Sequence, residues 1–309
     1  MVALKLNLPS FKRLFVGLSG GLDSMVLAHA CAHIHPRCIL IHIHHHLQPE
    51  ADQWLKFVTD FACQNALFLE VFHVKTQPGP AESIEDFARQ ARYAFFTSIL
   101  TEPTDVLCLA HHQDDQVETF FLNLARGSGL NGLTAMPDSR PLGEGLLLRP
   151  LLEYSRAELE RYAHCNGLSW IQDPSNQDER FDRNFLRKTV LPLLKSRWPR
   201  FQDKVENSIA HLQEARLLLD AHLDEMLLDV QESEAQVSLK KMRILTHSAQ
   251  KLLLQHWFKK YAHLNLTSVH LECIIQDFLS TGNDAAPLFQ FHGWDLRRNR
   301  QALFLEKTN

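Results

Sequence analysis

The stretch Arg13-Leu-Phe-Val-Gly-Leu-Ser-Gly-Gly-Leu-Asp-Ser24 decides the fold of the first half of the chain. It opens with an apolar run typical of a buried strand and closes with a glycine-rich turn into a helical pattern. Glycine reaches positive φ, and a helix N-terminus favours negative charge, so this context forms an anion-binding nest. We expect phosphate groups to bind at Ser19, Gly20, Gly21, Leu22, Asp23 and Ser24, with Asp23 also holding a cation. A plain strand–helix turn remains the alternative.

Outward from this stretch, short apolar runs alternate with helical patterns. Strands are expected over 13–17, 38–43, 67–74, 106–110 and 146–148. Helices are expected over 24–33, 50–65, 82–100 and 113–126. Such alternation predicts an α/β fold whose parallel sheet carries helices on both faces. Ligands of such sheets bind at the carboxyl ends of the strands.

The pattern becomes mainly helical after Pro150. Ser155 and Glu158 match a capping box. Further helices are expected over 181–196, 203–230, 247–263 and 268–280, and a terminal hairpin over 288–305. Trp198-Pro199 interrupts the helical pattern, so we expect a catalytic domain over 1–200 and a mainly helical domain over 201–309.

Composition restricts the class of protein. The chain has 309 residues, 45% hydrophobic and 22% charged, which is the balance of a folded protein of about two domains. Its six cysteines form no C-x-x-C pair, which disfavours a zinc ribbon and an oxidised scaffold. No apolar run is long enough for a membrane span and no signal peptide is evident, so we expect a cytoplasmic protein without a membrane partner.

A second polar segment follows the strand expected over 106–110. Asp115 and Glu118 lie three residues apart and would share one face at the first turn of a helix. Such a pair suits Mg²⁺ or an ammonium group, and His111 or His112 could orient phosphate or move a proton. An ordinary acidic helix start is the alternative.

A basic segment is a candidate RNA contact. Residues 180–204 contain eight basic residues against two acidic ones, interleaved with aromatic residues that include Phe181, Phe185 and Trp198. This composition fits contacts to RNA phosphates and bases, and a charged helix face is the alternative. Arg183 and Arg187 belong to this segment.

Two other patterns remain open or are disfavoured. His42, His44, His45 and His46 could include metal ligands or could belong to an ordinary loop, and the sequence does not separate their roles. The G-x-G-x-x-G pattern at 127–132 follows an expected helix rather than a strand, so it does not predict a dinucleotide site. A flexible loop that binds an anion or faces RNA is the better interpretation.

Several of these segments together resemble a known family. S-G-G-L-D-S at 19–24 resembles the PP-loop of the N-type ATP pyrophosphatases. The further segments are H-I-H-H-H-L at 42–47, I-E-D-F-A-R-Q-A-R-Y at 84–93, H-H-Q-D-D-Q-V-E-T with R-G-S-G within 111–129, and S-N-Q-D-E-R-F-D-R-N-F-L-R at 175–187. The whole set is similar to that of the tRNA(Ile)-lysidine synthetases and covers about residues 13–200.

The resemblance implies a two-step ligase reaction. ATP would adenylate O2 of the wobble cytidine in the CAU anticodon of tRNA(Ile), and the ε-amine of free L-lysine would then attack C2. The product, lysidine, would change decoding from AUG to AUA. ATP and Mg²⁺ are the implied cofactors, and Asp115 with Glu118 would hold lysine. The implied catalytic residues are Asp23, His111, His112, Asp115, Glu118, Arg183 and Arg187, and the implied RNA-binding residues are Arg126, Arg183 and Arg187.

Two alternatives stand beside this interpretation. One is another PP-loop enzyme that modifies tRNA, although a thiolase usually needs a cysteine pair or a cluster. The other is a non-catalytic RNA-binding protein with a degenerate nucleotide site, which would have no need for an intact pyrophosphate nest. The sequence leaves both a monomer and a homodimer open.

Overall fold

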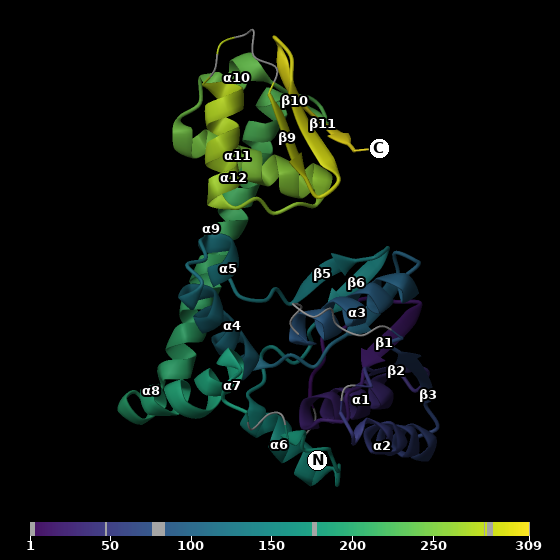
Figure 1. Ribbon diagram of the computed structural model, residues 1–309. Coiled ribbons are helices and arrows are strands. Elements are labelled where there is room, and N and C mark those ends of the chain that lie inside the picture. The colour runs from purple at the N-terminus through teal and green to yellow at the C-terminus, as the bar shows by residue number, and fades with distance from the viewer. Residues whose placement is uncertain are drawn as a thin grey trace. The chain divides into compact units, whose positions relative to one another are not determined.

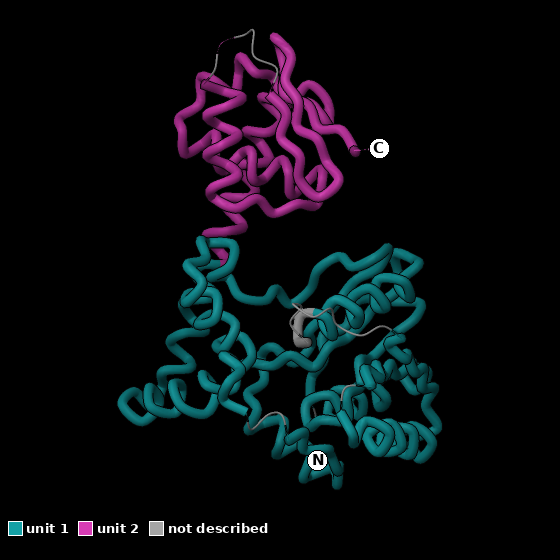
Figure 2. Tube along the Cα trace, in the orientation of Figure 1, with its two compact units in different colours: residues 1–212 teal, residues 213–309 magenta. Residues whose placement is uncertain are grey.

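The computed structural model describes residues 4–46, 48–75, 84–174, 178–280, 282 and 287–308. Leu47 and residues 175–177, which belong to two of the motif segments above, lie outside the described residues. The chain forms two compact units, Met1–Leu212 and Gln213–Asn309 (Figure 2). The division falls inside α9 (Phe201–Val230), whereas residue 200 lies in the break between α8 (Leu191–Arg197) and α9.

The first unit contains a six-stranded sheet in the order β3-β2-β1-β4-β6-β5 (Figure 1). Its strands are β1 (Arg13–Gly17), β2 (Ile39–His44), β3 (Phe68–His73), β4 (Asp105–Cys108), β5 (Ser139–Leu142) and β6 (Gly145–Leu148). All neighbours pair in parallel except β5, which pairs antiparallel with β6 at the edge. The predicted parallel sheet is therefore confirmed, and the edge strand β5 was not foreseen.

Helices cover both faces of this sheet, and successive side chains of β1 are buried on opposite faces. Leu14 and Val16 belong to the core packed with α1 (Leu22–Ile34), α2 (Ala51–Gln64) and α6 (Arg156–Cys165). Phe15 belongs to the opposite core, which includes residues of α3 (Ile84–Ile99). Strands that bury both faces are typical of such doubly covered sheets. The prediction of helices on both faces is confirmed.

The remaining elements of the first unit are helical, and several of them carry polar side chains of the site described below. The elements are α4 (Gln113–Ala125), α5 (Leu130–Leu133), α7 (Asp182–Phe185), the π-helical segment η2 (Leu186–Val190) and α8. The predicted capping box is confirmed, since the Ser155 side chain accepts from the Glu158 N–H and Glu158 reciprocates. The helix expected over 181–196 is present but is widened in its middle by η2.

The second unit packs helices against a five-stranded antiparallel sheet in the order β7-β8-β11-β10-β9. Its helical elements are α10 (Leu239–Arg243), α11 (His247–Trp257), η3 (Phe258–Ala262), α12 (Ser268–Ile274) and η4 (Ile275–Leu279). Its strands are β7 (Gln231–Ser233), β8 (Gln236–Ser238), β9 (Leu288–Phe291), β10 (Trp294–Arg298) and β11 (Ala302–Lys307). The expected terminal hairpin corresponds to β10 and β11. Among the described residues, no helix has both the length and the apolar character needed to cross a membrane.

Candidate active site

The glycine-rich loop joins the carboxyl end of β1 to the start of α1. Gly20 has φ +90°, a conformation that L side chains rarely adopt. Gly21 is the N-cap residue of α1 and has no side chain with which to cap the first turn. The Ser24 hydroxyl accepts from the Ser19 N–H at 3.1 Å and donates to the Gly21 carbonyl at 2.9 Å. These contacts preform the loop and leave the first-turn N–H groups for an anion.

Neighbouring segments hold the loop in place. The Ile171 N–H donates to the Gly20 carbonyl at 2.9 Å, and a Cβ on Gly20 would lie 2.6 Å from Ile171 Cδ1 and 3.3 Å from Val58 Cγ1. Just before the loop, His42 Nδ1 lies 2.8 Å from the Leu18 carbonyl oxygen. Residue 20 therefore has two independent reasons to be glycine, its backbone conformation and its close packing.

The Asp23 carboxylate faces polar side chains from two other elements. Arg156 Nη1, at the start of α6, donates to both of its oxygens at 3.1 and 2.8 Å. His112 Nε2 lies 3.7 Å from Asp23 Oδ2 and 3.5 Å from Asp115 Oδ2. His112 is the N-cap residue of α4 and is almost fully buried. The loop and the start of α4 therefore meet around one buried imidazole.

Asp115 and Glu118 are both buried and lie three residues apart on α4, as the sequence predicts, but only Asp115 belongs to the first turn and Glu118 lies on the next turn. Arg187 of η2 donates to Glu118 Oε1 at 2.6 Å through Nε and to Oε2 at 3.0 Å through Nη2. The same Nη2 lies 3.5 Å from Asp115 Oδ1, and Arg183 Nε lies 3.0 Å from Glu118 Oε2. Both carboxylates are therefore paired with guanidinium groups in this structure.

The surroundings push the pKa values of these two acids apart. Burial raises the pKa of Glu118 above its ordinary value, and the charge of Arg187 only partly opposes this. Burial also acts to raise the pKa of Asp115, but the neighbouring His112 and Arg183 outweigh it and the net shift is downward. Two acids with opposite shifts in one site are typical of groups that can divide proton-transfer roles.

His111 is a weaker candidate for proton transfer. Burial lowers its pKa to about 3, against the opposing charge of Asp115. Its Nδ1 atom is buried and has no hydrogen-bond partner. A base works best when its pKa lies near the operating pH, so His111 would accept a proton poorly at neutral pH.

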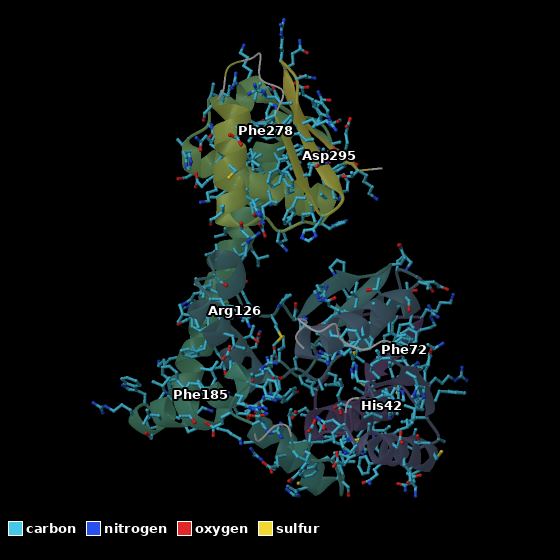
Figure 3. All side chains as sticks on the ribbon, in the orientation of Figure 1. His42, Phe72, Arg126, Phe185, Phe278 and Asp295 are labelled. Carbon is cyan, nitrogen blue, oxygen red and sulfur yellow. The ribbon has the colours of Figure 1, made fainter. Side chains whose placement is uncertain are left out.

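The sequence-predicted site residues do not all come together. Arg183 and Arg187 lie at Glu118, as given above. Arg126 is exposed at the C-terminal end of α4, whose 13 residues carry it roughly 20 Å from the helix start. Figure 3 labels Arg126 well away from His42, which lies beside the loop. The G-x-G-x-x-G segment follows α4, so the dinucleotide context is absent there, as expected.

The four histidines at the end of β2 differ in their contacts, although the ring centroids of His44 and His46 lie only 4.0 Å apart. His42 contacts Leu18, and His44 Nε2 lies 3.1 Å from Asp52 Oδ1. Burial lowers the pKa of His45 to about 4. His46 Nε2 lies 3.1 Å from Nδ1 of His73, a residue of β3 that sequence reasoning did not associate with this group.

The sequence did not predict two further residues of the site. Arg156 pairs with Asp23 across 133 positions, and Ile171 packs on Gly20. In the sequence Arg156 is visible only as the residue after the capping Ser155, and nothing there points to Asp23. Ile171 carries no signal because an isoleucine beside a loop is ordinary.

One glutamate next to the site gives a testable pH dependence. Burial raises the pKa of Glu206 from 4.5 to about 7, although Gln113 Nε2 donates to its Oε2 at 2.5 Å. A raised carboxyl pKa means that the folded chain binds this proton more tightly than the unfolded chain. The contribution of Glu206 to the free energy of unfolding is therefore fully present below pH 4.5 and is lost as the pH rises through 7.

We expect Glu206→Gln to raise the free energy of unfolding at pH 8 by about 1–2 kcal/mol and to flatten its decline between pH 5 and 8. Urea unfolding at the two pH values measures this. Glu225→Gln, at an exposed position of the same helix, is the matched control and should follow the unchanged protein. An equally steep decline in Glu206→Gln would show that Glu206 does not titrate in this range.

The parallel sheet and the glycine-rich loop define this chain as a protein with a PP-loop domain. The PP-loop domain family matches residues 3–194, and the TilS substrate binding domain family matches residues 237–304. A solved U34-tRNA thiolase NcsA from Methanococcus maripaludis, with its [4Fe-4S] cluster, has the same fold in its matched part. The TM-score is 0.56 at 17% identity, over 67% of this chain and 74% of that chain.

Curated relatives identify the family within this class. The tRNA(Ile)-lysidine synthase of Coxiella burnetii is 38% identical over 306 residues, which is 98% of this chain and 68% of the relative. The enzyme of the same name from Pseudomonas fluorescens is 40% identical over 301 residues, 94% of this chain and 67% of the relative. The chain belongs to the tRNA(Ile)-lysidine synthase family.

Proposed function

We propose that this chain ligates lysine to C2 of the wobble cytidine in the CAU anticodon of tRNA(Ile), with ATP cleaved to AMP and pyrophosphate. Cytidine O2 would first attack the α-phosphorus of ATP, forming the adenylated base and releasing pyrophosphate. The neutral ε-amine of lysine would then attack C2 and expel AMP. The substrate in this proposal is tRNA, and we place the reaction in the cytoplasm.

The observation that carries this proposal is a convergence of three motif segments in space. Asp23 of the loop lies 3.7 Å from His112, and Asp115 and Glu118 of the next segment contact Arg187 of the last. The three segments are far apart in the sequence, and each carries one of the motifs that resemble the family. A protein that only bound RNA would not need them assembled around a phosphate-binding loop.

The residues present fit ATP with Mg²⁺. The loop offers N–H groups at the start of α1, and Ser19 and Ser24 add hydroxyls within 3.0 Å of each other. The carboxylates of Asp23 and Asp115 converge on His112, and oxygen donors of this kind suit Mg²⁺. When bound, the metal would neutralise charge on the leaving pyrophosphate. Asp23 would hold it in exchange for its present partner Arg156.

The second step needs a site for an ammonium group and an acceptor for its proton. We place the lysine ε-ammonium at Asp115 and Glu118, which requires it to share these carboxylates with Arg187. Glu118 suits the proton acceptor better than His111, because burial raises the pKa of Glu118 toward neutrality and lowers that of His111 to about 3.

An aromatic and basic surface supports RNA as the substrate. Trp198 and Phe201 stack with ring centroids 6.0 Å apart and line a pocket of about 320 Å³ together with Pro199, Arg200 and Lys204. Trp198 remains 53% exposed, which leaves its ring available to a base. Stacking plus phosphate-binding cations is the usual combination for single-stranded RNA. The second unit, with its substrate-binding match, would supply further tRNA contacts.

We expect Trp198→Ala to weaken tRNA binding by about 5- to 150-fold, the range of one lost base–aromatic stack of ~1–3 kcal/mol. Filter binding at two salt concentrations measures the affinity. The salt slope should stay unchanged, because no phosphate contact is removed. Leu193→Ala, a 70% exposed apolar side chain of α8, is the control and should leave binding intact. Equal affinities for both variants would exclude Trp198 from the RNA site.

Incorporation of labelled lysine into purified tRNAs, with ATP and Mg²⁺, tests the function. ATP-dependent incorporation into tRNA(Ile) with the CAU anticodon, and none into methionine tRNA with the same anticodon, is the expected result. Pyrophosphate release without lysine incorporation would point instead to another PP-loop modification. Failure of both, in a protein that still binds tRNA, would favour a non-catalytic RNA-binding protein.

A further inference from the structure

Three histidines gather at the adjoining ends of β2 and β3. The parallel register of these strands places His44 opposite His73, and His46 follows two residues after His44. One side-chain nitrogen from each histidine lies within 4.8 Å of those of the other two. The rings are close as well, with centroids of His44 and His46 4.0 Å apart and those of His46 and His73 5.2 Å apart.

We propose that His44, His46 and His73 form a binding site for a zinc-type divalent transition metal. Neutral imidazole is a preferred ligand of Zn²⁺, Cu²⁺, Ni²⁺ and Co²⁺, whereas Mg²⁺ and Ca²⁺ prefer oxygen. Three histidines would leave the fourth position of a tetrahedral ion to water or to another ligand. This donor chemistry differs from the carboxylate donors that we assign to Mg²⁺.

The surroundings of His44 suit a metal ligand. Its side chain is 1% exposed, and its Nε2 lies 3.1 Å from the Asp52 carboxylate. That contact fixes the proton on Nε2 and leaves the lone pair on Nδ1. The Nδ1 atom is buried and has no hydrogen-bond partner. A carboxylate that holds one imidazole nitrogen while the other binds metal is the usual outer-shell arrangement of zinc sites.

The spacing of the other two histidines fits the same ion. His46 Nε2 and His73 Nδ1 are 3.1 Å apart. Two nitrogens bound to one tetrahedral Zn²⁺ at 2.0–2.1 Å would be separated by roughly 3.3–3.4 Å, which is close to the present separation, and the ion would replace the hydrogen bond between the two rings. Both residues are exposed, which gives an ion access from solvent.

The site is separate from the glycine-rich loop. His42, whose Nδ1 contacts the Leu18 carbonyl, lies between the loop and His44 along β2. A bound ion would join the ends of two neighbouring strands and would stabilise that edge of the sheet. We therefore expect it to affect stability and not the chemistry of the ligation, and the inference does not depend on the proposed function.

The test is Zn²⁺ binding to the metal-free chain of residues 1–309, measured by competition with a chromophoric chelator and by the rise in Tm. We expect one tight site per chain. His46→Ala combined with His73→Ala should weaken binding by at least about 100-fold and abolish the rise in Tm. Asp52→Asn should weaken binding by about 10- to 100-fold while the three ligands remain.

His211→Ala combined with His222→Ala removes two exposed histidines elsewhere and is the matched control. It should bind Zn²⁺ as the unchanged chain does. The proposal fails if the unchanged chain takes up no Zn²⁺, or if removing His46 and His73 weakens binding no more than this control. Since His46 and His73 are exposed, the test variant should fold, and an unaltered Tm without metal verifies this.

Discussion

Replacing Gly20 by alanine is expected to lower ATP-dependent pyrophosphate release at least about 100-fold. The added Cβ would lie 2.6 Å from Ile171 Cδ1, and alanine would have to adopt φ +90°. The isoleucine can move aside, but the backbone strain stays, because L residues rarely adopt this conformation. A rotated peptide would misdirect the N–H donors, and losing one preorganised donor typically costs 10²- to 10³-fold in rate.

Gly167→Ala is the matched control for this change. Gly167 also has a positive φ, +63°, and nothing lies within 4 Å of its added Cβ, so this variant imposes similar backbone strain outside the loop and should leave pyrophosphate release near normal. Pyrophosphate release with tRNA and ATP but no lysine isolates the first step. Near-normal release by Gly20→Ala would mean that the loop does not bind the triphosphate in the way we propose.

Glu118→Gln is expected to raise the KM for lysine by about 10- to 150-fold and to change the KM for ATP much less. The range corresponds to one lost charge-assisted hydrogen bond of ~1.5–3 kcal/mol. Glutamine keeps the size of the side chain but removes the charge that would attract an ammonium group. It also cannot accept the proton that we assign to the carboxylate. Steady-state kinetics with each substrate varied in turn gives the two constants.

The control for this change is Glu102→Gln, at an exposed glutamate that pairs with Lys12 at 2.7 Å. Exposed pairs contribute little, so neither KM should change. A larger rise in the KM for ATP than in that for lysine would reassign Glu118 to the nucleotide. Circular dichroism of the variant is needed, because the change also leaves Arg187 with a weaker partner.

The local features of the site were predictable from sequence, and its long-range partners were not. The strand–glycine–helix context of 19–24 and the shared face of Asp115 and Glu118 follow from backbone periodicity, which is local. The pairing of Asp23 with Arg156 depends on packing α6 beside α1, across 133 positions. No periodicity encodes such a contact. The facing of His44 and His73 depends on strand register and was equally invisible.

The strands of the second unit show the same limit. β7 and β8 have three residues each, too few to display the alternation that identifies a strand. They exist because β8 pairs with the terminal strand β11. The hairpin of β10 and β11 was accessible because its alternation is longer and breaks at a turn. Arg126 is the opposite case. The glycine-rich segment that follows it suggests an anion or RNA contact, but the structure places Arg126 at the C-terminal end of α4, away from Asp115 and Glu118.

The long helix α9 has a consequence for how the chain folds. Val205 and Ile209 belong to a core of the first unit, whereas Leu223, Leu227 and Val230 belong to the core of the second. Starting a helix is costly and extending one is not. Whichever unit collapses first therefore presents finished turns from which the remainder of α9 can grow. The cost of starting α9 therefore falls only once for the two units, and during synthesis the N-terminal unit is the first to leave the ribosome.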